Sequence, residues 1–320
     1  MKQLGLGLNL STRKTRKREF LEEMERVVPW AALVQIVEPH YPRAKTGRPP
    51  FAIETMLRIH YLQQWFGLSD PAMEEALHDV PLYREFARLD GVTARLPDET
   101  TILRFRHLLE RHNLAVDMLR VVNDILHAKG LLMRTGTAVD ATLISAPSST
   151  KNADGERDPE MKPTRKGNNW YFGMKAHIGV DAQSGLVHTV AGTAASVNDL
   201  NMAGALLHGD EEVAFGDAGY QGVHKRPEAA GPTWHVAMRP GKRRKLNPFI
   251  EPDFVAERVE KMKASIRAKV EHPFRVIKRQ FGFTKVRYRG LQKNATRAFT
   301  ALALANIYLA RRGLMGEVRP

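Results

Sequence analysis

The stretch TGTAVDATLISAP (Thr135–Pro147) decides the fold class of this chain. It overlaps a run, Leu131–Ile144, that is rich in β-branched and apolar residues, which is typical of a strand buried in a sheet. Asp140 follows Thr137-Ala138-Val139 and so lies at the end of this strand or within it. An aspartate in that position is costly unless a positive group compensates it. The stretch therefore predicts a sheet and makes Asp140 a candidate functional residue.

Further strands are expected downstream, each a short run of β-branched and aromatic residues bounded by turn residues. The sequence DAQSG (Asp181–Gly185) fits a hairpin turn between two of them. The polar segment Ser145–Asn169 shows no periodicity, and we expect a mobile loop there. The predicted strands are Trp170–Val180, Leu186–Ala191, Val213–Phe215 and Trp234–Met238.

Helices complete this half of the chain. Asp199–His208 has a helical pattern, Phe254–Phe281 carries an apolar residue at every third or fourth position, and Ala295–Arg312 is nearly all apolar. Pro273 falls inside the long helix, where a proline removes a hydrogen bond. Because the apolar period continues past it, we expect a kink near Glu271 and not a break.

The first half of the chain has a different pattern. From Glu19 to His127, apolar residues recur at helical spacing, and clusters of proline and glycine interrupt them. We therefore predict a basic N-terminal arm over residues 1–18, an all-α domain over residues 19–130, and an α/β domain over residues 131–320.

The composition indicates a polyanionic partner. The net charge is +14 and the isoelectric point is about 10.0, which favours nucleic acid; the alternative is a ribosome-associated or merely soluble basic protein. The chain has no cysteine, which excludes disulfides and cysteine-ligated metal sites. We see no signal peptide and no apolar run of the roughly 20 residues that span a membrane, so we expect a soluble, cytoplasmic protein.

Asp217 and Glu271 have surroundings like those of Asp140. Asp217 follows the apolar run that begins at Val213, and Glu271 comes directly after Val270, at the border of the predicted buried face. Three carboxylates near the edge of a core suggest a hard-metal site, because oxygen ligands suit Mg²⁺ or Mn²⁺. Two such ions about 3.5–4 Å apart activate an attacking oxygen and stabilise a leaving one in phosphoryl displacement. The alternative is that each carboxylate caps a turn or pairs with an arginine.

Basic residues near these acids and elsewhere are candidate DNA contacts. Arg267 and Lys278 lie on the same helical face as Glu271, so they could grip phosphates on either side of it. The alternative is a weak surface pair between Arg267 and Glu271. The other candidates are Arg104 and Arg106, on a helix that Asp98 caps, and the cluster Lys242-Arg243-Arg244. For these, the alternatives are an ordinary amphipathic helix and a solvated run of charge.

Other chemistries find less support. His177, His188 and His208 are scattered and show no metal-binding spacing. The sequence has no glycine-rich phosphate loop followed by Lys-Ser/Thr, so we expect no nucleotide cofactor.

The sequence resembles bacterial insertion-sequence transposases of the group founded by insertion sequence five, within the DDE class. The resemblance spans nearly the whole chain. Its C-terminal part also matches a Y-x2-R-x3-E-x6-K signature at Arg267, Glu271 and Lys278, although Ala264 stands at the tyrosine position. The matching segments are PDETTILRFR (Pro97–Arg106), TGTAVDATLISAP (Thr135–Pro147), WYFGMKAHIGVD (Trp170–Asp181), VAFGDAGYQG (Val213–Gly222) and VEHPFRVIKRQFGFTKVRYR (Val270–Arg289).

This resemblance implies a ribonuclease-H-like catalytic domain, with a mixed sheet flanked by helices and Asp140, Asp217 and Glu271 as the metal-binding triad. It implies that the helical domain helps to bind the terminal inverted repeats and to form a homodimer on DNA. We expect cleavage at the element's ends and transfer of the 3′-hydroxyls to target double-stranded DNA, with two Mg²⁺ ions, for which Mn²⁺ substitutes. Lys285, Arg287 and Arg289 of the KVRYR run join the candidate DNA contacts.

Two alternatives remain open at this point. One is a metal-dependent nuclease of the same fold that does not join strands. The other is a non-catalytic DNA-binding protein derived from a transposase, which is expected to carry a damaged triad.

Overall fold

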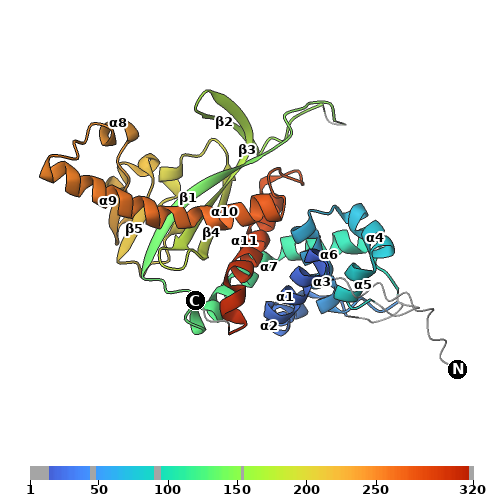
Figure 1. The fold of residues 1–320 in the computed structure, drawn as a ribbon. Helices are drawn as coiled ribbons and strands as arrows, with labels where there is room; N and C mark the ends of the chain where they lie inside the picture. The colour runs from blue at the N-terminus through green and yellow to red at the C-terminus, as the bar shows by residue number, and fades with distance from the viewer. Residues whose placement is uncertain (1–13, 44–47, 90–94, 153–154, 317–320) are drawn as a thin grey trace.

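The computed structural model describes residues 14–43, 48–89, 95–152 and 155–316. Most of the predicted arm over residues 1–18 therefore lies outside the described residues, and its end, from Arg16, belongs to the first helix. Figure 1 shows a sheet on one side of the molecule, a group of N-terminal helices on the other, and the C-terminal helix between them.

The N-terminal half is helical, as predicted. Local signals in the sequence set several helix ends: Ser69 and Asp98 accept hydrogen bonds from the backbone N–H groups of Ala72 and Thr101, and Gly67 ends a helix with φ of +64°. The helices are α1 (Arg16–Val27), α2 (Trp30–Val37), η2 (Glu38–His40), α3 (Ile53–Phe66), α4 (Asp70–Asp79), α5 (Pro81–Phe86), α6 (Glu99–Arg111) and α7 (Leu114–Ala128).

The sheet is mixed and, within the described residues, has six strands. The central strand β3 pairs antiparallel with β1, β2 and β4, whereas β5 runs parallel to both β1 and β6. Each predicted strand is confirmed, with slightly different bounds. The strands are β1 (Gly136–Ser145), β2 (Lys162–Lys166), β3 (Asn169–Asp181), β4 (Val187–Ala194), β5 (Val213–Gly216) and β6 (Thr233–Val236).

The prediction that residues 145–169 form only a loop is wrong. Lys162–Lys166 forms β2, which pairs with the first residues of β3 across a turn at Gly167, where φ is +61°. Both faces of β2 are largely exposed, because this hairpin projects beyond the body of the sheet (Figure 1). A strand that is wet on both faces has no alternation of apolar and polar residues to reveal it.

The helix predicted over residues 199–208 is two short 3₁₀ turns, η3 (Asp199–Met202) and η4 (Gly204–Leu206). Gly204 lies so close to the Glu228 backbone that a Cβ would come within 2.0 Å of its carbonyl oxygen. This close packing favours a tight, irregular turn. Three further 3₁₀ turns follow β5, namely η5 (Ala218–Tyr220), η6 (Val223–Lys225) and η7 (Pro227–Ala229).

The long predicted helix is a continuous helical path with changing hydrogen bonding. It consists of α9 (Glu251–Arg267), the 3₁₀ turn η8 (Ala268–Val270), α10 (Glu271–Arg275) and the π-helical turn η9 (Val276–Gln280). The hydrogen-bonding pattern changes just before Glu271. The reason is that Pro273 has no backbone N–H to donate to the carbonyl oxygen of residue 269, as an α-helix would require. The path runs on past the proline, as predicted (Figure 1).

The apolar stripe of this helix is buried only in its second half. Val270, Phe274 and Ile277 are in the core, but the earlier members are exposed, which contradicts the prediction. The reason is that α9 runs outward past the sheet toward α8 (Pro240–Arg243), so its first turns have little to pack against (Figure 1). The exposed members are Phe254, Val255, Val259 and Met262.

The C-terminal helix α11 (Leu291–Leu314) is buried along much of its length, as predicted. Asn306 on this helix donates to the Asn123 side chain of α7 at 2.8 Å and exchanges two hydrogen bonds with the backbone of Val187 on β4. One hydrophobic core therefore extends from the N-terminal helices through α11 to the sheet. No helix in the described ranges is both long and apolar enough to cross a membrane.

Candidate active site

Asp140 lies on β1 opposite Ile178 of β3. Its residue is half-buried, and its Oδ1 accepts a hydrogen bond from the backbone N–H of Ala141 at 2.7 Å, which fixes the orientation of the carboxylate. Burial raises the pKa of Asp140 to about 6, well above its usual value of 3.8. The strand thus holds a carboxyl group that keeps its proton to a higher pH than an ordinary aspartate does.

Asp217 stands directly after β5, the strand that pairs with β1. Its Oδ1 accepts from the N–H of Gly219 at 2.7 Å and so caps the turn η5. Gly216 allows this arrangement, because a Cβ there would lie within 2.9 Å of the Tyr220 side chain. The glycine lets the tyrosine pack under the strand end, where the aspartate projects.

Glu271 is the first residue of α10, immediately after the 3₁₀ turn. The sequence predicted that it borders the buried face, but its side chain is exposed. The next turn of the helix is buried, with Pro273 and Phe274 in the core. The acid therefore stands on the solvent side of an anchored helix.

The three acids share one electrostatic environment. Besides burial, the negative charges of Asp217 and Glu271 both raise the pKa of Asp140, and Arg267 opposes them. The carboxylates come from two adjacent parallel strands and the helix that follows them. Such a set of oxygen ligands with a surplus of negative charge suits a hard divalent cation.

The family model described as the transposase DDE domain matches residues 132–307, which include all three acids. A second model, described as a transposase domain (DUF772), matches residues 8–108. The chain belongs to the DDE transposase family. No solved structure matches this transposase.

Two residues near the transposase site were not singled out in the sequence. Burial raises the pKa of Tyr220, and the charges of Asp140, Asp199 and Asp217 raise it further, so Tyr220 and Asp199 share the acidic environment. Asp199 pairs with Lys175 of β3 at 2.9 Å. Tyr220 could have been found, because it lies in the quoted segment VAFGDAGYQG. Asp199 carried no signal in a run that looked like an ordinary helix.

Arg267 and Lys278, which flank Glu271 in the sequence, have different surroundings. Arg267 is half-buried beside the acids. Lys278 is half-buried too, and its Nζ donates to the carbonyl oxygen of Leu143 on β1 at 2.9 Å. Ala264, at the tyrosine position of the signature, is exposed on α9.

Arg106 was predicted to contact DNA, but its side chain is buried in the transposase interior. It pairs with Asp70 at 2.9 Å and Glu110 at 2.7 Å, and its guanidinium lies 3.9 Å from the centre of the Tyr288 ring. These contacts engage both terminal nitrogens of the guanidinium and cover its planar face. Arg106 therefore joins α6 to the segment after η9, and we withdraw it as a candidate DNA contact.

The remaining basic candidates lie at the surface. Arg104, Lys242, Arg244 and Lys285 are exposed. Arg243 pairs with Glu257 at 2.8 Å, and Arg287 donates to the carbonyl of Gly67. Arg289 is exposed as well.

Proposed function

We propose that this protein is an insertion-sequence transposase of the group founded by insertion sequence five. In this proposal it binds the terminal inverted repeats, cleaves DNA at the element's ends and joins the freed 3′-hydroxyls to target DNA. The observation that carries the proposal is that Asp140, Asp217 and Glu271, the last two near enough to raise the pKa of the first, all lie within the matched DDE transposase domain.

The donor set fits divalent ions. Asp140 and Asp217 each have one oxygen held by a backbone N–H, so their carboxylates are oriented before any ion binds. The raised pKa of Asp140 reflects burial and negative neighbours, both of which a cation would offset. Two bound Mg²⁺ ions, or Mn²⁺ in their place, would activate the attacking oxygen and stabilise the leaving oxygen.

The protein's own residues position the reactants. Arg267 is close enough to the acids to lower the pKa of Asp140, so it can pair with a phosphate that enters the site. Exposed Arg104, Lys242, Arg244 and Lys285 can each pair with a phosphate of the DNA backbone, in keeping with the net charge of +14. Neither cleavage nor joining needs a nucleotide cofactor, because the phosphodiester bond itself is exchanged.

The architecture supports a ribonuclease-H-like catalytic domain over residues 131–320 and a helical domain over residues 19–130 that binds DNA ends and dimerises. The mixed sheet, with antiparallel β1, β3 and β4 and parallel β5 and β6, is consistent with that fold. We expect a homodimer in the DNA complex, because the two ends of the element must be brought together and both joined to the target. Since its substrate would be chromosomal DNA, we expect the protein at the bacterial nucleoid.

A joining assay separates this function from a nuclease. Labelled double-stranded DNA that carries pre-cut inverted-repeat ends is incubated with protein, Mg²⁺ and a target plasmid. We expect the end to become covalently joined to the target. Cleavage of uncut ends in a parallel reaction, without joining of the pre-cut ends, would favour a nuclease of the same fold. Full biological function without a divalent metal would favour a non-catalytic DNA-binding protein.

A further inference from the structure

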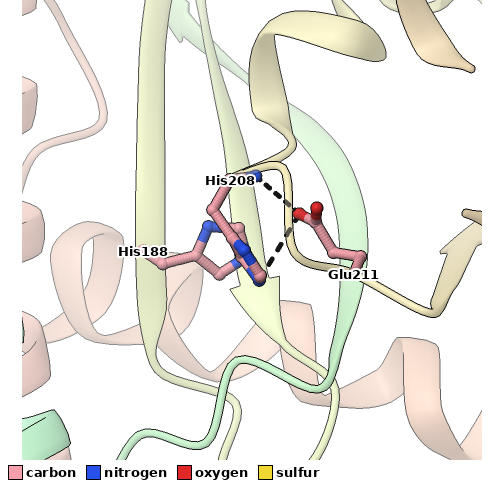
Figure 2. A group of neighbouring side chains, drawn as sticks. All are labelled: His188, His208 and Glu211. Carbon is pink, nitrogen blue, oxygen red and sulfur yellow. Dashed lines mark hydrogen bonds and ion pairs between the residues drawn. The ribbon is translucent and has the colours of Figure 1, made fainter. Parts of the chain in front are cut away.

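Two histidines and a glutamate, none of them part of the acidic triad, gather beside the sheet (Figure 2). His188 is on β4, His208 follows η4, and Glu211 precedes β5. Their ligand atoms all lie within 4.8 Å of one another. The sequence prediction that the histidines are scattered is therefore wrong for His188 and His208, because turns η3 and η4 bring the chain back beside β4.

We propose that His188, His208 and Glu211 bind a divalent transition-metal ion, best matched by Zn²⁺, at a structural site distinct from the acidic triad. Imidazole and carboxylate ligands suit zinc, whereas Mg²⁺ prefers oxygen ligands alone. Three protein ligands leave a fourth position for water or for the nearby hydroxyl of Thr137.

The tautomer of His188 changes when an ion binds. The Thr137 hydroxyl donates its hydrogen to Glu211, so the His188 ring donates to the Thr137 oxygen from Nε2. To ligate through Nε2, the neutral ring carries its proton on Nδ1 instead, which lies 2.9 Å from the hydroxyl oxygen of Thr189.

The geometry leaves one ligand unsatisfied. Among the described residues, the buried Nε2 of His208 has no hydrogen-bond partner, and it lies 3.5 Å from Oε1 of Glu211. Two ligands of one tetrahedral zinc ion are about 3.3 Å apart, so this pair is already at that spacing. The backbone N–H groups of His208 and Gly209 hold the Glu211 carboxylate at 2.6 Å and 2.8 Å.

Thr137 bridges the third ligand, His188, to Glu211. The hydroxyl of Thr137 lies 2.9 Å from Nε2 of His188 and donates to Oε1 of Glu211, also at 2.9 Å. An ion at the centre of the cluster would take over this bridging position, with a small shift of the threonine. The His188 and His208 rings, whose centres are 4.8 Å apart, need only turn their nitrogens inward.

An ion at this site would act on the two strands that carry the aspartates. Thr137 is three residues before Asp140 on β1, and Glu211 is two residues before β5, whose end carries Asp217. An ion held by β4 and by the segment before β5 would fix the start of both strands that carry the aspartates. We therefore expect it to stabilise the fold without taking part in the reaction.

The test measures Zn²⁺ binding to the purified full chain by calorimetry and thermal unfolding. Excess Mg²⁺ is present, and the Asp140→Asn background is used so that the acidic triad does not contribute. His208→Ala removes one ligand. The matched control is His40→Ala with His112→Ala, since these two exposed histidines also stack, at 4.2 Å between ring centres, but have no place in the cluster.

We expect one Zn²⁺ per chain, a higher midpoint of thermal unfolding with zinc, and at least about a tenfold loss of affinity in His208→Ala. The His40/His112 control should bind as the parent does. Unchanged zinc binding in His208→Ala, or its loss in the His40/His112 control, would overturn the proposal. If His208→Ala does not fold, X-ray absorption on the zinc-loaded parent decides: two imidazoles and an oxygen support the site, and an all-oxygen shell contradicts it.

Discussion

Lys278 donates a hydrogen bond from its Nζ to the carbonyl oxygen of Leu143 at 2.9 Å. The bond joins the helical turn after Glu271 to the strand that carries Asp140, so it fixes the distance between the elements that bear the two acids. Burial lowers the pKa of Lys278, while the charge of Glu271 opposes that shift. Lys278 was predicted as a DNA contact; from this bond we propose that it also positions the two acids.

Lys278→Met is therefore expected to reduce end cleavage more than end binding. Misplacing a reacting group by about 1 Å costs on the order of a hundredfold in rate, and we expect a loss between tenfold and that value. Cleavage rates and gel-shift affinities of the variant give the comparison. The matched control is exposed Lys285→Met, which should weaken binding and lower the salt slope by about one. If Lys278→Met instead weakens binding and lowers the salt slope as the control does, Lys278 acts as a DNA contact and not as a positioning residue.

Replacing the two arginines of α6, Arg104 and Arg106, should affect the stability of the fold to different extents. Arg106→Ala leaves Asp70 and Glu110 buried without their partner, so the free energy of unfolding should fall by about 3–5 kcal/mol. Arg104→Ala removes an exposed charge and should leave stability within about 0.5 kcal/mol. Urea denaturation of both variants tests this. Equal stabilities would contradict the structural role assigned to Arg106.

His60 is predicted to make the fold sensitive to acid. Burial lowers its pKa to about 4 from 6.5, and neither ring nitrogen has a hydrogen-bond partner among the described residues. The unfolded chain therefore binds more protons than the folded one between these values, so stability is full above pH 6.5 and falls as the pH drops toward 4. At pH 5 the loss is roughly 1–2 kcal/mol.

His60→Phe should reduce this loss, because an aromatic ring without titratable atoms replaces one that makes no hydrogen bond. Unfolding is measured at pH 7 and pH 5 for both proteins, and the difference between the two pH values should shrink in the variant. The same acid sensitivity in both would assign the loss to other groups. His188 and His177 are the next to examine, since burial lowers their pKa values to about 3 and about 4.

The sequence pattern could predict the elements that have one buried and one exposed face, and those that are wholly buried. The strands at Asp140 and Asp217, the N-terminal helices and α11 belong to these classes. It could not predict β2, which is exposed on both faces, or the exposure of the first half of α9. An apolar period is the same whether or not a partner surface covers it, so Val255 and Val259 looked like core.

The candidate site was predictable in its residues but not in its surroundings. Asp140 and Asp217 stood out because each acid follows an apolar run, and Glu271 because it borders the apolar face of a long helix; the family resemblance then joined the three in one site. Arg106 was misjudged because Asp70 and Tyr288, which bury it, are far away in the chain. The cluster of His188, His208 and Glu211 was missed for the same reason: pairing of β4 with β3 and the turns after it bring the residues together, and no sequence spacing records that.

The carboxyl of Asp140 should destabilise the metal-free protein as the pH rises. Its pKa is about 6 in the folded chain and near 3.8 otherwise, so the folded state binds the extra proton between those values. The favourable contribution is complete below about pH 4 and is lost as the pH rises through 6. Asp140 is half-buried, so the loss should be on the order of 1–2 kcal/mol.

This slope is measured by thermal unfolding in a chelator between pH 5 and pH 7.5. Asp140→Asn should remove it, because the amide does not titrate, and Mg²⁺ should offset it in the parent. Asp117→Asn is the control, since Asp117 on α7 has 43% of its side chain exposed and pairs with Arg120 on the same helix. If the stability of Asp140→Asn still falls as the pH rises, the loss does not come from ionisation of Asp140.

The most direct test of the central claim compares the parent, Asp140→Asn and Asp117→Asn in one assay of end binding, end cleavage and strand joining with Mg²⁺. The account predicts that Asp140→Asn folds and binds the inverted-repeat ends but neither cuts nor joins them, while Asp117→Asn does all three. Cleavage and joining by Asp140→Asn at the rate of the parent would contradict the account, because Asp140 could then not be a ligand of the catalytic metal ions.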